Sequence, residues 1–71
     1  MAGMTFDGHQ YLFDSNTLFD STGEALAYYE PPTAYTEYCY LIDASTREVV
    51  HSWHENEPPG LRDIIGIMAN G

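Results

Sequence analysis

The sequence contains no lysine, and its only basic residues are Arg47 and Arg62, against eleven Asp and Glu residues. The formal net charge of the 71-residue chain is therefore -9. A protein that binds nucleic acid directly must neutralise phosphates with Lys and Arg, and an anionic membrane surface recruits the same residues. The shortage of basic residues therefore argues against direct nucleic-acid binding and against binding to a membrane.

Cysteine and long apolar runs are also scarce. Cys39 is the only cysteine, so no disulfide can form within the chain, and a lone cysteine is typical of a reducing compartment. No apolar run approaches the roughly 20 residues that cross a bilayer, and the N-terminus lacks the basic-then-apolar pattern of a signal peptide. We therefore expect a cytoplasmic protein with one domain over residues 1–71 and a thin stability margin.

Apolar and aromatic residues, by contrast, are abundant. Hydrophobic residues make up 44% of the chain and aromatic residues 14%, including six tyrosines. A disordered acidic tail is poor in such residues because it cannot bury enough apolar surface to offset the entropy of ordering. The sequence therefore predicts a folded, strongly acidic small domain.

The clearest local pattern is a hairpin over residues 37–53, with a turn at residues 43–47. Apolar and polar residues alternate on both sides of this turn, as in paired antiparallel strands. We assign one face of the hairpin to the core, and six side chains are expected to share it: Tyr38, Tyr40, Ile42, Val49, His51 and Trp53. The opposite face is then expected to hold Cys39 and Leu41 with the polar residues.

A second hairpin is predicted around residues 18–25, because Asp20 leads into a Ser-Thr-Gly turn in which Gly23 suits a left-handed conformation. The same segment permits a second interpretation. Residues 21–24 also match a helix-capping box, and residues 25–29 could continue as a short helix before Pro31. The hairpin is the preferred interpretation, and the helix remains the alternative.

A short strand and a proline connector are also predicted. Residues 11–14 indicate a short strand followed by a turn at Ser15 and Asn16, and Pro31 with Pro32 forms a stiff connector between the two hairpins. The fold class is therefore α+β, with a small antiparallel sheet of three to five strands and one C-terminal helix packed on it.

The C-terminal helix is predicted from its apolar spacing. Leu61, Ile64, Ile65 and Met68 recur at the intervals that form one stripe on a helix. Ile67 lies off this stripe and is expected to be exposed. The β-branched residues of this segment would also suit a last edge strand, which is the alternative.

The chain contains residues that could bind a metal or form a reactive thiol, but their spacing does not bring them together. His51, His54, Glu55 and Glu57 could bind a metal by type, yet residues three apart on a strand face opposite sides. No cofactor or metal is therefore expected. Cys39 and His51 are the only cysteine–histidine pair that the hairpin could bring near, and the predicted register places them on opposite faces. An enzyme is accordingly not expected.

The acidic residues are spread along the whole chain, and the tyrosines are too many for a small core. Carboxylates at strand ends and turns, with exposed tyrosines among them, predict a surface that meets a basic partner. We expect eleven residues to contribute to it: Asp20, Glu24, Tyr28, Tyr29, Glu30, Tyr35, Glu37, Asp43, Glu48, Glu55 and Glu57.

In size, charge and aromatic content the chain resembles small acidic proteins of phages and mobile elements, such as anti-CRISPR proteins and uracil-DNA glycosylase inhibitors. No family motif matches residue by residue. The resemblance implies an inhibitor that mimics nucleic acid and binds a basic protein or nucleoprotein complex. Two alternatives remain open. One is a structural protein that forms a homodimer or larger homo-oligomer and whose charge serves solubility, and the other is adaptation to high salt.

Overall fold

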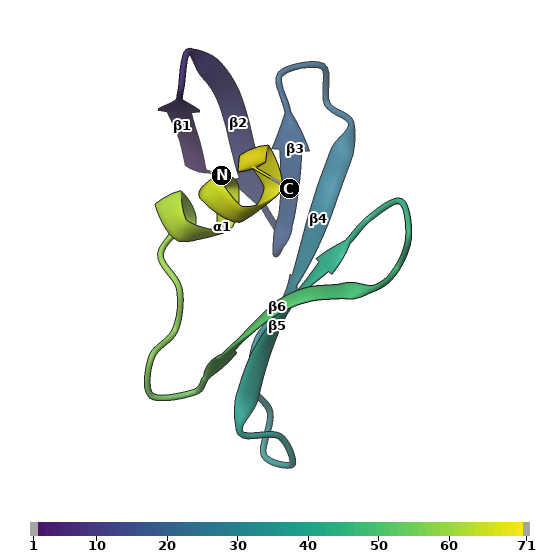
Figure 1. Ribbon diagram of the computed structural model, residues 1–71, viewed down its shortest axis with the longest axis vertical. Coiled ribbons are helices and arrows are strands. Elements are labelled where there is room, and N and C mark those ends of the chain that lie inside the picture. Colours follow the sequence, from purple (N-terminus) through teal and green to yellow (C-terminus); the bar gives the residue numbers. More distant parts are fainter. Residues whose placement is uncertain (1, 71) are drawn as a thin grey trace.

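The computed structural model describes residues 2–70, which form one antiparallel sheet and one helix (Figure 1). The elements are β1 (Ala2–Phe6), β2 (His9–Asp14), β3 (Thr17–Asp20), β4 (Ala25–Glu30), β5 (Tyr38–Asp43), β6 (Val49–His54) and α1 (Leu61–Asn70). The strands pair in chain order, so β1 and β6 form the two edges. The α+β class and the C-terminal helix are confirmed, but the sheet has six strands rather than three to five.

The additional strand arises from the β1–β2 hairpin. Asp7 and Gly8 form its two-residue turn with φ angles of 51° and 80°, which Gly adopts freely and Asp tolerates. Met4 pairs with Tyr11 across the hairpin, so their side chains share a face. Ser15 and Asn16, at φ 51° and 61°, make the predicted turn between β2 and β3.

The hairpin predicted around residues 18–25 is confirmed, and the helical alternative for residues 21–29 is wrong. β3 and β4 pair as antiparallel strands, with Leu18 opposite Ala27. Gly23 lies at φ 87°, a conformation that a side chain would strain. Residues 25–30 form a strand and not a helix because β4 lies between β3 and β5 and pairs with both.

The predicted register of the β5–β6 hairpin is correct only beside the turn. Ile42 pairs with Val49 as expected, but Leu41 then pairs with His51 because Val50 is an extra residue in β6. Such a bulge moves every later pair by one position. Tyr40 therefore pairs with Ser52 and not with His51. Trp53 pairs with Cys39 and not with Tyr38.

The predicted core face of β5 is also wrong. Cys39 and Leu41 are fully buried, whereas Tyr38 is 45% exposed and Tyr40 lies on the same side as Tyr38. We call the face that contains Leu41 the inner face and the opposite one the outer face. β5 is apolar at five successive positions, 38–42, so its alternation does not identify the buried side. The helix decides this, because it covers the inner face.

Helix α1 forms as predicted and supplies the second layer of the core. The Gly60 N–H donates to the Asp63 carboxylate at 3.0 Å, which caps the first turn. Ile64 and Ile65 are buried against Leu18 and Leu41 of the sheet. Ile67 was expected to be exposed, but it is half-buried and packs against this cluster.

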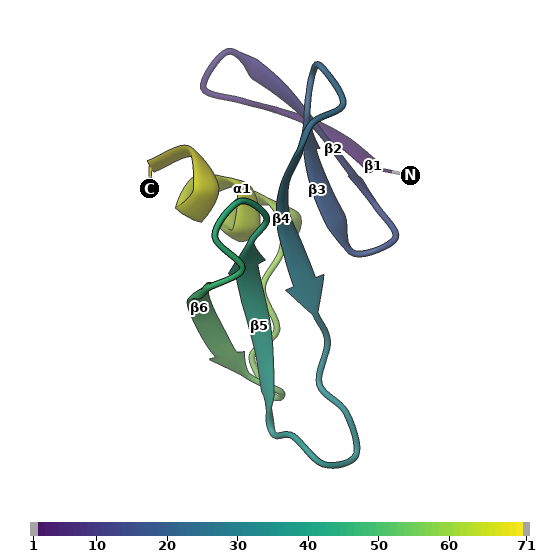
Figure 2. The same cartoon turned by 90° about the vertical axis from the view of Figure 1, so that its right-hand side faces the viewer.

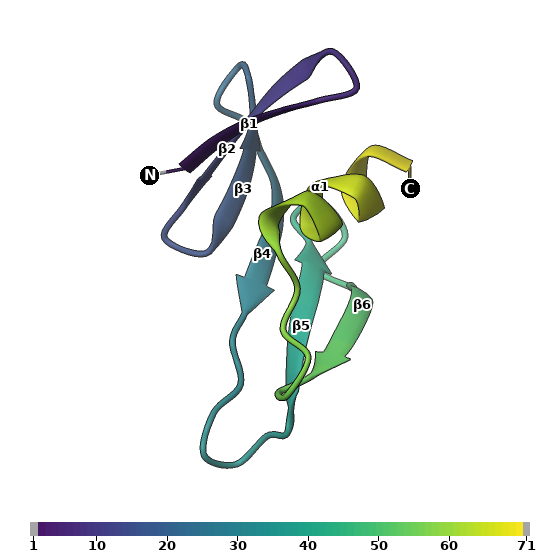
Figure 3. The same cartoon turned by 90° about the vertical axis from the view of Figure 1, so that its left-hand side faces the viewer.

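The two faces of the sheet have different surroundings. Figures 2 and 3 show α1 on one side of the sheet only, with β1–β3 toward one edge of the sheet and β5–β6 toward the other. The outer face has no second layer in residues 2–70, and Leu12, Tyr38 and Val49 are 40%, 45% and 55% exposed. The only helix among these residues is too short to cross a membrane.

Truncating one core side chain should unfold much of this domain. Leu18 is fully buried at the centre of the cluster, and a Leu18→Ala change removes packing worth about 2–5 kcal/mol. A domain of this size has only about 3–5 kcal/mol from its core. We expect Leu18→Ala to lose most of its cooperative urea unfolding transition. Val49→Ala, at an exposed position, should change the free energy of unfolding by less than about 1 kcal/mol.

Candidate functional site

All eleven acidic residues lie away from the central parts of the strands. Each occupies the last residue of a strand, a connection or the first turn of α1, where Asp63 is found. Because each strand runs antiparallel to the one before it, successive connections lie alternately at the two opposite ends of the strands. One end therefore holds Asp7, Asp20, Glu24, Asp43 and Glu48. The other end holds Asp14, Glu30, Glu37, Glu55 and Glu57.

Both basic side chains lie over aromatic rings. The guanidinium of Arg47 lies 5.2 Å from the ring centroid of Tyr28, and that of Arg62 lies 5.4 Å from the ring centroid of Phe6. At these distances each cation is attracted by the negative face of the ring. The two positive charges are thus placed on apolar parts of the sheet, and the carboxylates dominate its ends.

At the first end, two of the carboxylates hold turns together. Asp20 accepts hydrogen bonds from the N–H groups of Thr22 at 2.9 Å and Glu24 at 3.0 Å. Asp43 accepts from the N–H groups of Ser45 at 2.8 Å and Thr46 at 3.1 Å. The two turns use the same device, in which Asp caps the amides that follow it.

These hydrogen bonds favour the charged form of both carboxylates. The Thr22 hydroxyl and the Glu24 amide lower the pKa of Asp20 below 3.8. The hydroxyl and amide of Ser45 lower the pKa of Asp43 in the same way. Asp20 and Asp43 were predicted to contact a partner, and their structural role is to order the turns. Glu24 and Glu48 beside them are exposed.

At the opposite end, the β4–β5 loop presents a tyrosine. Tyr35 is 98% exposed, the most exposed large apolar residue of those described. The loop around it is ordered by hydrogen bonds. Thr33 donates its N–H to the Thr36 hydroxyl at 3.0 Å, and the Tyr35 N–H donates to the Thr33 hydroxyl at 3.2 Å. An aromatic side chain held outward by an ordered turn is available for contact with another molecule.

Four exposed carboxylates surround this loop. The N–H of Glu55 donates to the carbonyl oxygen of Glu37 at 2.7 Å, which joins the start of β5 to the end of β6. Tyr38 follows Glu37 and packs edge-on against His54, with ring centroids 5.7 Å apart. We define the tyrosine–carboxylate end by the members of this group: Glu30, Tyr35, Glu37, Tyr38, Glu55 and Glu57.

The other predicted tyrosines lie elsewhere. Tyr28 is on the outer face beneath Arg47. Tyr29 is on the inner face and packs against the core, where burial and the neighbouring Cys39 thiol raise its pKa to about 12. Tyr38 was missed as a contact residue because it was assigned to the core. Its exposure depends on which face α1 covers, and the strand pattern does not encode this.

The structure also changes the placement of the cysteine and histidine pair. Cys39 and His51 were expected on opposite faces, but the bulge at Val50 brings both to the inner face. Cys39 is fully buried there. His51 packs against Trp53 with ring centroids 4.5 Å apart. No three metal-ligating side chains of residues 2–70 lie close enough together to hold an ion.

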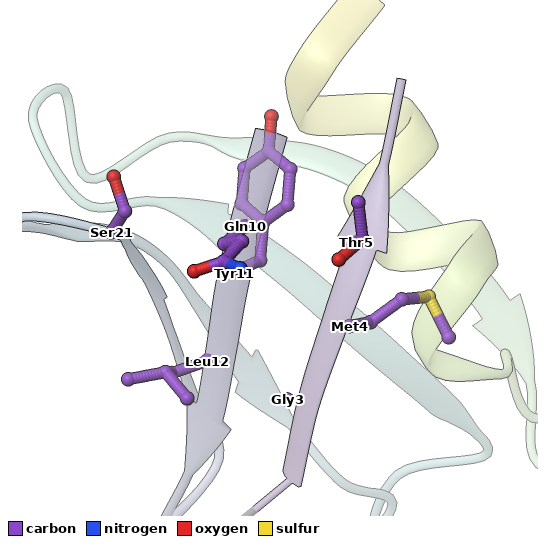
Figure 4. Close-up of a pocket in the computed structure, with 7 residues that line it drawn as sticks. All are labelled: Gly3, Met4, Thr5, Gln10, Tyr11, Leu12 and Ser21. Carbon is purple, nitrogen blue, oxygen red and sulfur yellow. The ribbon is translucent and has the colours of Figure 1, made fainter. Parts of the chain in front are cut away.

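The surface of residues 2–70 contains at least two depressions. One, of about 300 Å³, lies along the β1–β2 hairpin beside Ser21, where Gly3 leaves space next to Leu12 (Figure 4). Its lining contains no carboxylate, imidazole or thiol. The other, of about 640 Å³, lies between α1 and the inner side of β6, and Trp53 and Ile67 contribute to its lining.

Comparison of the chain with protein-family models, with curated proteins and with solved structures found no match.

The two turn aspartates should make the domain sensitive to acid. Their pKa values are lower in the folded state than in the unfolded state, so they stabilise the fold above pH 3.8. This contribution is lost as the pH falls through the lowered values. An Asp20→Asn, Asp43→Asn double variant keeps the turn acceptors but cannot titrate. Between about pH 5 and pH 3, its urea midpoint should fall less than that of the wild type.

A matched double variant, Asp7→Asn with Asp14→Asn, removes two exposed acids outside these turns. It should follow the wild-type pH profile. Identical profiles for both double variants and the wild type would contradict the role assigned to Asp20 and Asp43.

Proposed function

We propose that this protein is an acidic binding module that engages a basic protein surface through its tyrosine–carboxylate end. The observation that supports the proposal most directly is Tyr35, which is 98% exposed at the tip of a hydrogen-bonded loop with Glu30 and Glu37 at the two ends of that loop. A large apolar ring bordered by negative charge suits a partner that offers a pocket rimmed by Lys and Arg.

The proposed contact combines two physical effects. Carboxylates on an otherwise cation-poor surface raise the rate of encounter with a positive partner, and salt weakens this steering. Burial of the Tyr35 ring would supply short-range affinity. Because Thr33 and Thr36 already order the loop, less conformational entropy is lost on binding.

A protein surface that binds nucleic acid is the kind of partner that this chemistry fits. Such a surface is built to neutralise phosphates with Lys and Arg. The Glu30, Glu37, Glu55 and Glu57 carboxylates would lie where phosphates lie, so the module would act as an inhibitor that competes with DNA or RNA. This is the mode of action of the small acidic phage and mobile-element proteins that the chain resembles in size and charge.

Neutralising the carboxylates of the tyrosine–carboxylate end should weaken this binding more than neutralising four exposed acids outside that group. The test variant combines Glu30→Gln, Glu37→Gln, Glu55→Gln and Glu57→Gln, and the matched control combines Asp7→Asn, Asp14→Asn, Glu24→Gln and Glu48→Gln. Each set removes four acids and changes the net charge from -9 to -5. We expect the test variant to bind a captured basic partner at least about tenfold more weakly, with a flatter salt dependence.

The measurement begins with capture of partners from a lysate by the tagged wild-type chain at low and moderate salt. The affinity of the purified partner for each variant is then measured at several salt concentrations, with and without competing DNA or RNA. Equal weakening by the two sets would show that net charge alone acts. A partner that binds this protein and nucleic acid at the same time would contradict the competition.

The uncovered outer face supports a second candidate, a homo-oligomer. Leu12, Tyr38 and Val49 are exposed on it, and a second copy could cover them. The charge of -9 on each copy opposes this contact, so self-association should strengthen with salt. Sedimentation velocity at several protein and salt concentrations tests this candidate. A monomer in about 1 M salt, where repulsion is screened, would exclude it.

A further inference from the structure

We propose that the open edge of β6 accepts an extended segment of the basic partner as a seventh strand of the sheet. The proposal rests on the proposed function for the sign of the partner's charge, and it adds a mode of contact. Addition of a strand to a sheet edge is a common way to bind an extended peptide, because the main chain supplies the hydrogen bonds.

The β6 edge is accessible. β6 is the last strand of the sheet, and Figures 2 and 3 show no other element along its free side. Four successive residues, 49–52, are exposed, although alternate residues of a half-covered strand are normally buried. β6 contains neither lysine nor proline, the residues with which many proteins block such an edge.

Successive residues of β6 direct their main-chain N–H and C=O groups alternately toward β5 and away from it, and this alternation identifies the free groups. The Glu55 N–H donates to the Glu37 carbonyl, so residues 55, 53 and 51 direct their main-chain groups toward β5. The intervening residues direct theirs outward. The Ser52 N–H and C=O and the His54 N–H are therefore available to a new strand. The His54 C=O is not, because it accepts the Glu57 N–H at 2.9 Å.

A depression on the inner side of β6 would receive side chains of the added strand. It has a volume of about 640 Å³, and the rings of His51 and Trp53 line it from the strand. Ile67 and Gly66 line it from the helix. In strand addition, alternate side chains of the peptide occupy such pockets and determine specificity. The lining combines the apolar side chains of Phe6, Trp53 and Ile67 with the polar or charged side chains of His51, Arg62, Asp63 and Asn70. It therefore suits β-branched side chains of mixed polarity, such as Val and Thr.

The charges around β6 favour a basic occupant over a second copy of this chain. Glu48 precedes the strand and Glu55 follows it, while Arg47, next to Glu48, lies over the Tyr28 ring on the outer face. Asp63 and Arg62 both line the depression and offset each other, so the preference comes from the two glutamates at the strand ends. In an antiparallel pair of β6 strands, Glu48 of one copy would lie near Glu55 of the other. In a parallel pair, each would face itself. Both arrangements oppose like charges, whereas a segment with Lys or Arg at both ends matches them.

The test uses a synthetic peptide with the sequence KKTVTVTVKK and a matched peptide, EETVTVTVEE, with acidic ends. Binding to the wild-type chain is followed by NMR shifts and by hydrogen exchange of backbone amides. We expect the basic peptide to bind, to shift the amides of residues 49–54, and to slow exchange of the Ser52 and His54 amides. The acidic peptide should not bind.

Two variants locate the contact. Ser52→Pro removes an outward N–H without removing a hydrogen bond to β5, and Ser52→Ala retains that N–H. We expect Ser52→Pro to bind the basic peptide about tenfold more weakly and Ser52→Ala to bind it like the wild type. The proline variant is compared only after its thermal unfolding is measured. The exchange of Ser52 and His54 in the wild type provides an independent readout should that variant fail to fold.

Several outcomes would overturn the proposal. These are no binding of the basic peptide, equal binding by Ser52→Pro and the wild type, or shifts confined to the tyrosine–carboxylate end. The last outcome would leave the proposed function intact, because that end would then be the whole contact. Unchanged partner binding by the fourfold acid variant, with the basic peptide still bound at β6 of the wild-type chain, would instead contradict the proposed function alone.

Discussion

The packing of α1 on the inner face of the sheet is the contact on which the rest of the structure depends. A single antiparallel sheet needs a second layer to remove one face from water. Ile64 and Ile65 supply that layer over Leu18, Ala27 and Leu41. Because no disulfide can form, the stability of the fold depends on this small cluster and on the strand ladder.

This constraint also explains where the charges are found. A ten-residue helix covers the middle of the inner face, so carboxylates are accommodated at the ends of the strands. The meander then gathers acids from connections distant in sequence, as when Glu37 and Glu55 meet across β5 and β6. The acidic surface is therefore a consequence of topology, and an unfolded chain with the same composition would not group the acids in this way.

The parts of the fold with strong local determinants were predictable from the sequence. The helix stripe around Ile64 and the aspartate-led turns at Asp20 and Asp43 depend on neighbouring residues, and the structure confirms them. The β1–β2 hairpin was missed even though Asp7-Gly8 is a strong turn signal. The bulge at Val50 had no comparable signal, because several apolar residues surround it and either register buries some of them.

The candidate site was less predictable than the fold because exposure is a tertiary property. Tyr29 and Tyr38 are both aromatic strand residues, yet one packs under the helix and the other lies outside. The sequence indicates that some tyrosines must be exposed, but only the position of α1 determines which ones. Tyr35 is the exception, since its place between Pro32 and Glu37 already indicates a loop.

The acids at the strand ends also account for how an open edge can persist. An edge with exposed Val49 and Val50 invites pairing with another copy, and many proteins prevent this with lysine on the edge strand. Here Glu48 and Glu55 frame the strand, so a second copy meets like charge in either orientation. Because the repelling glutamates lie at the two ends of β6, the main-chain groups of Ser52 in its middle remain free. The same charges that oppose self-association would attract a basic strand, so in the proposed mode of contact one arrangement of charge would both hinder self-pairing and select the partner.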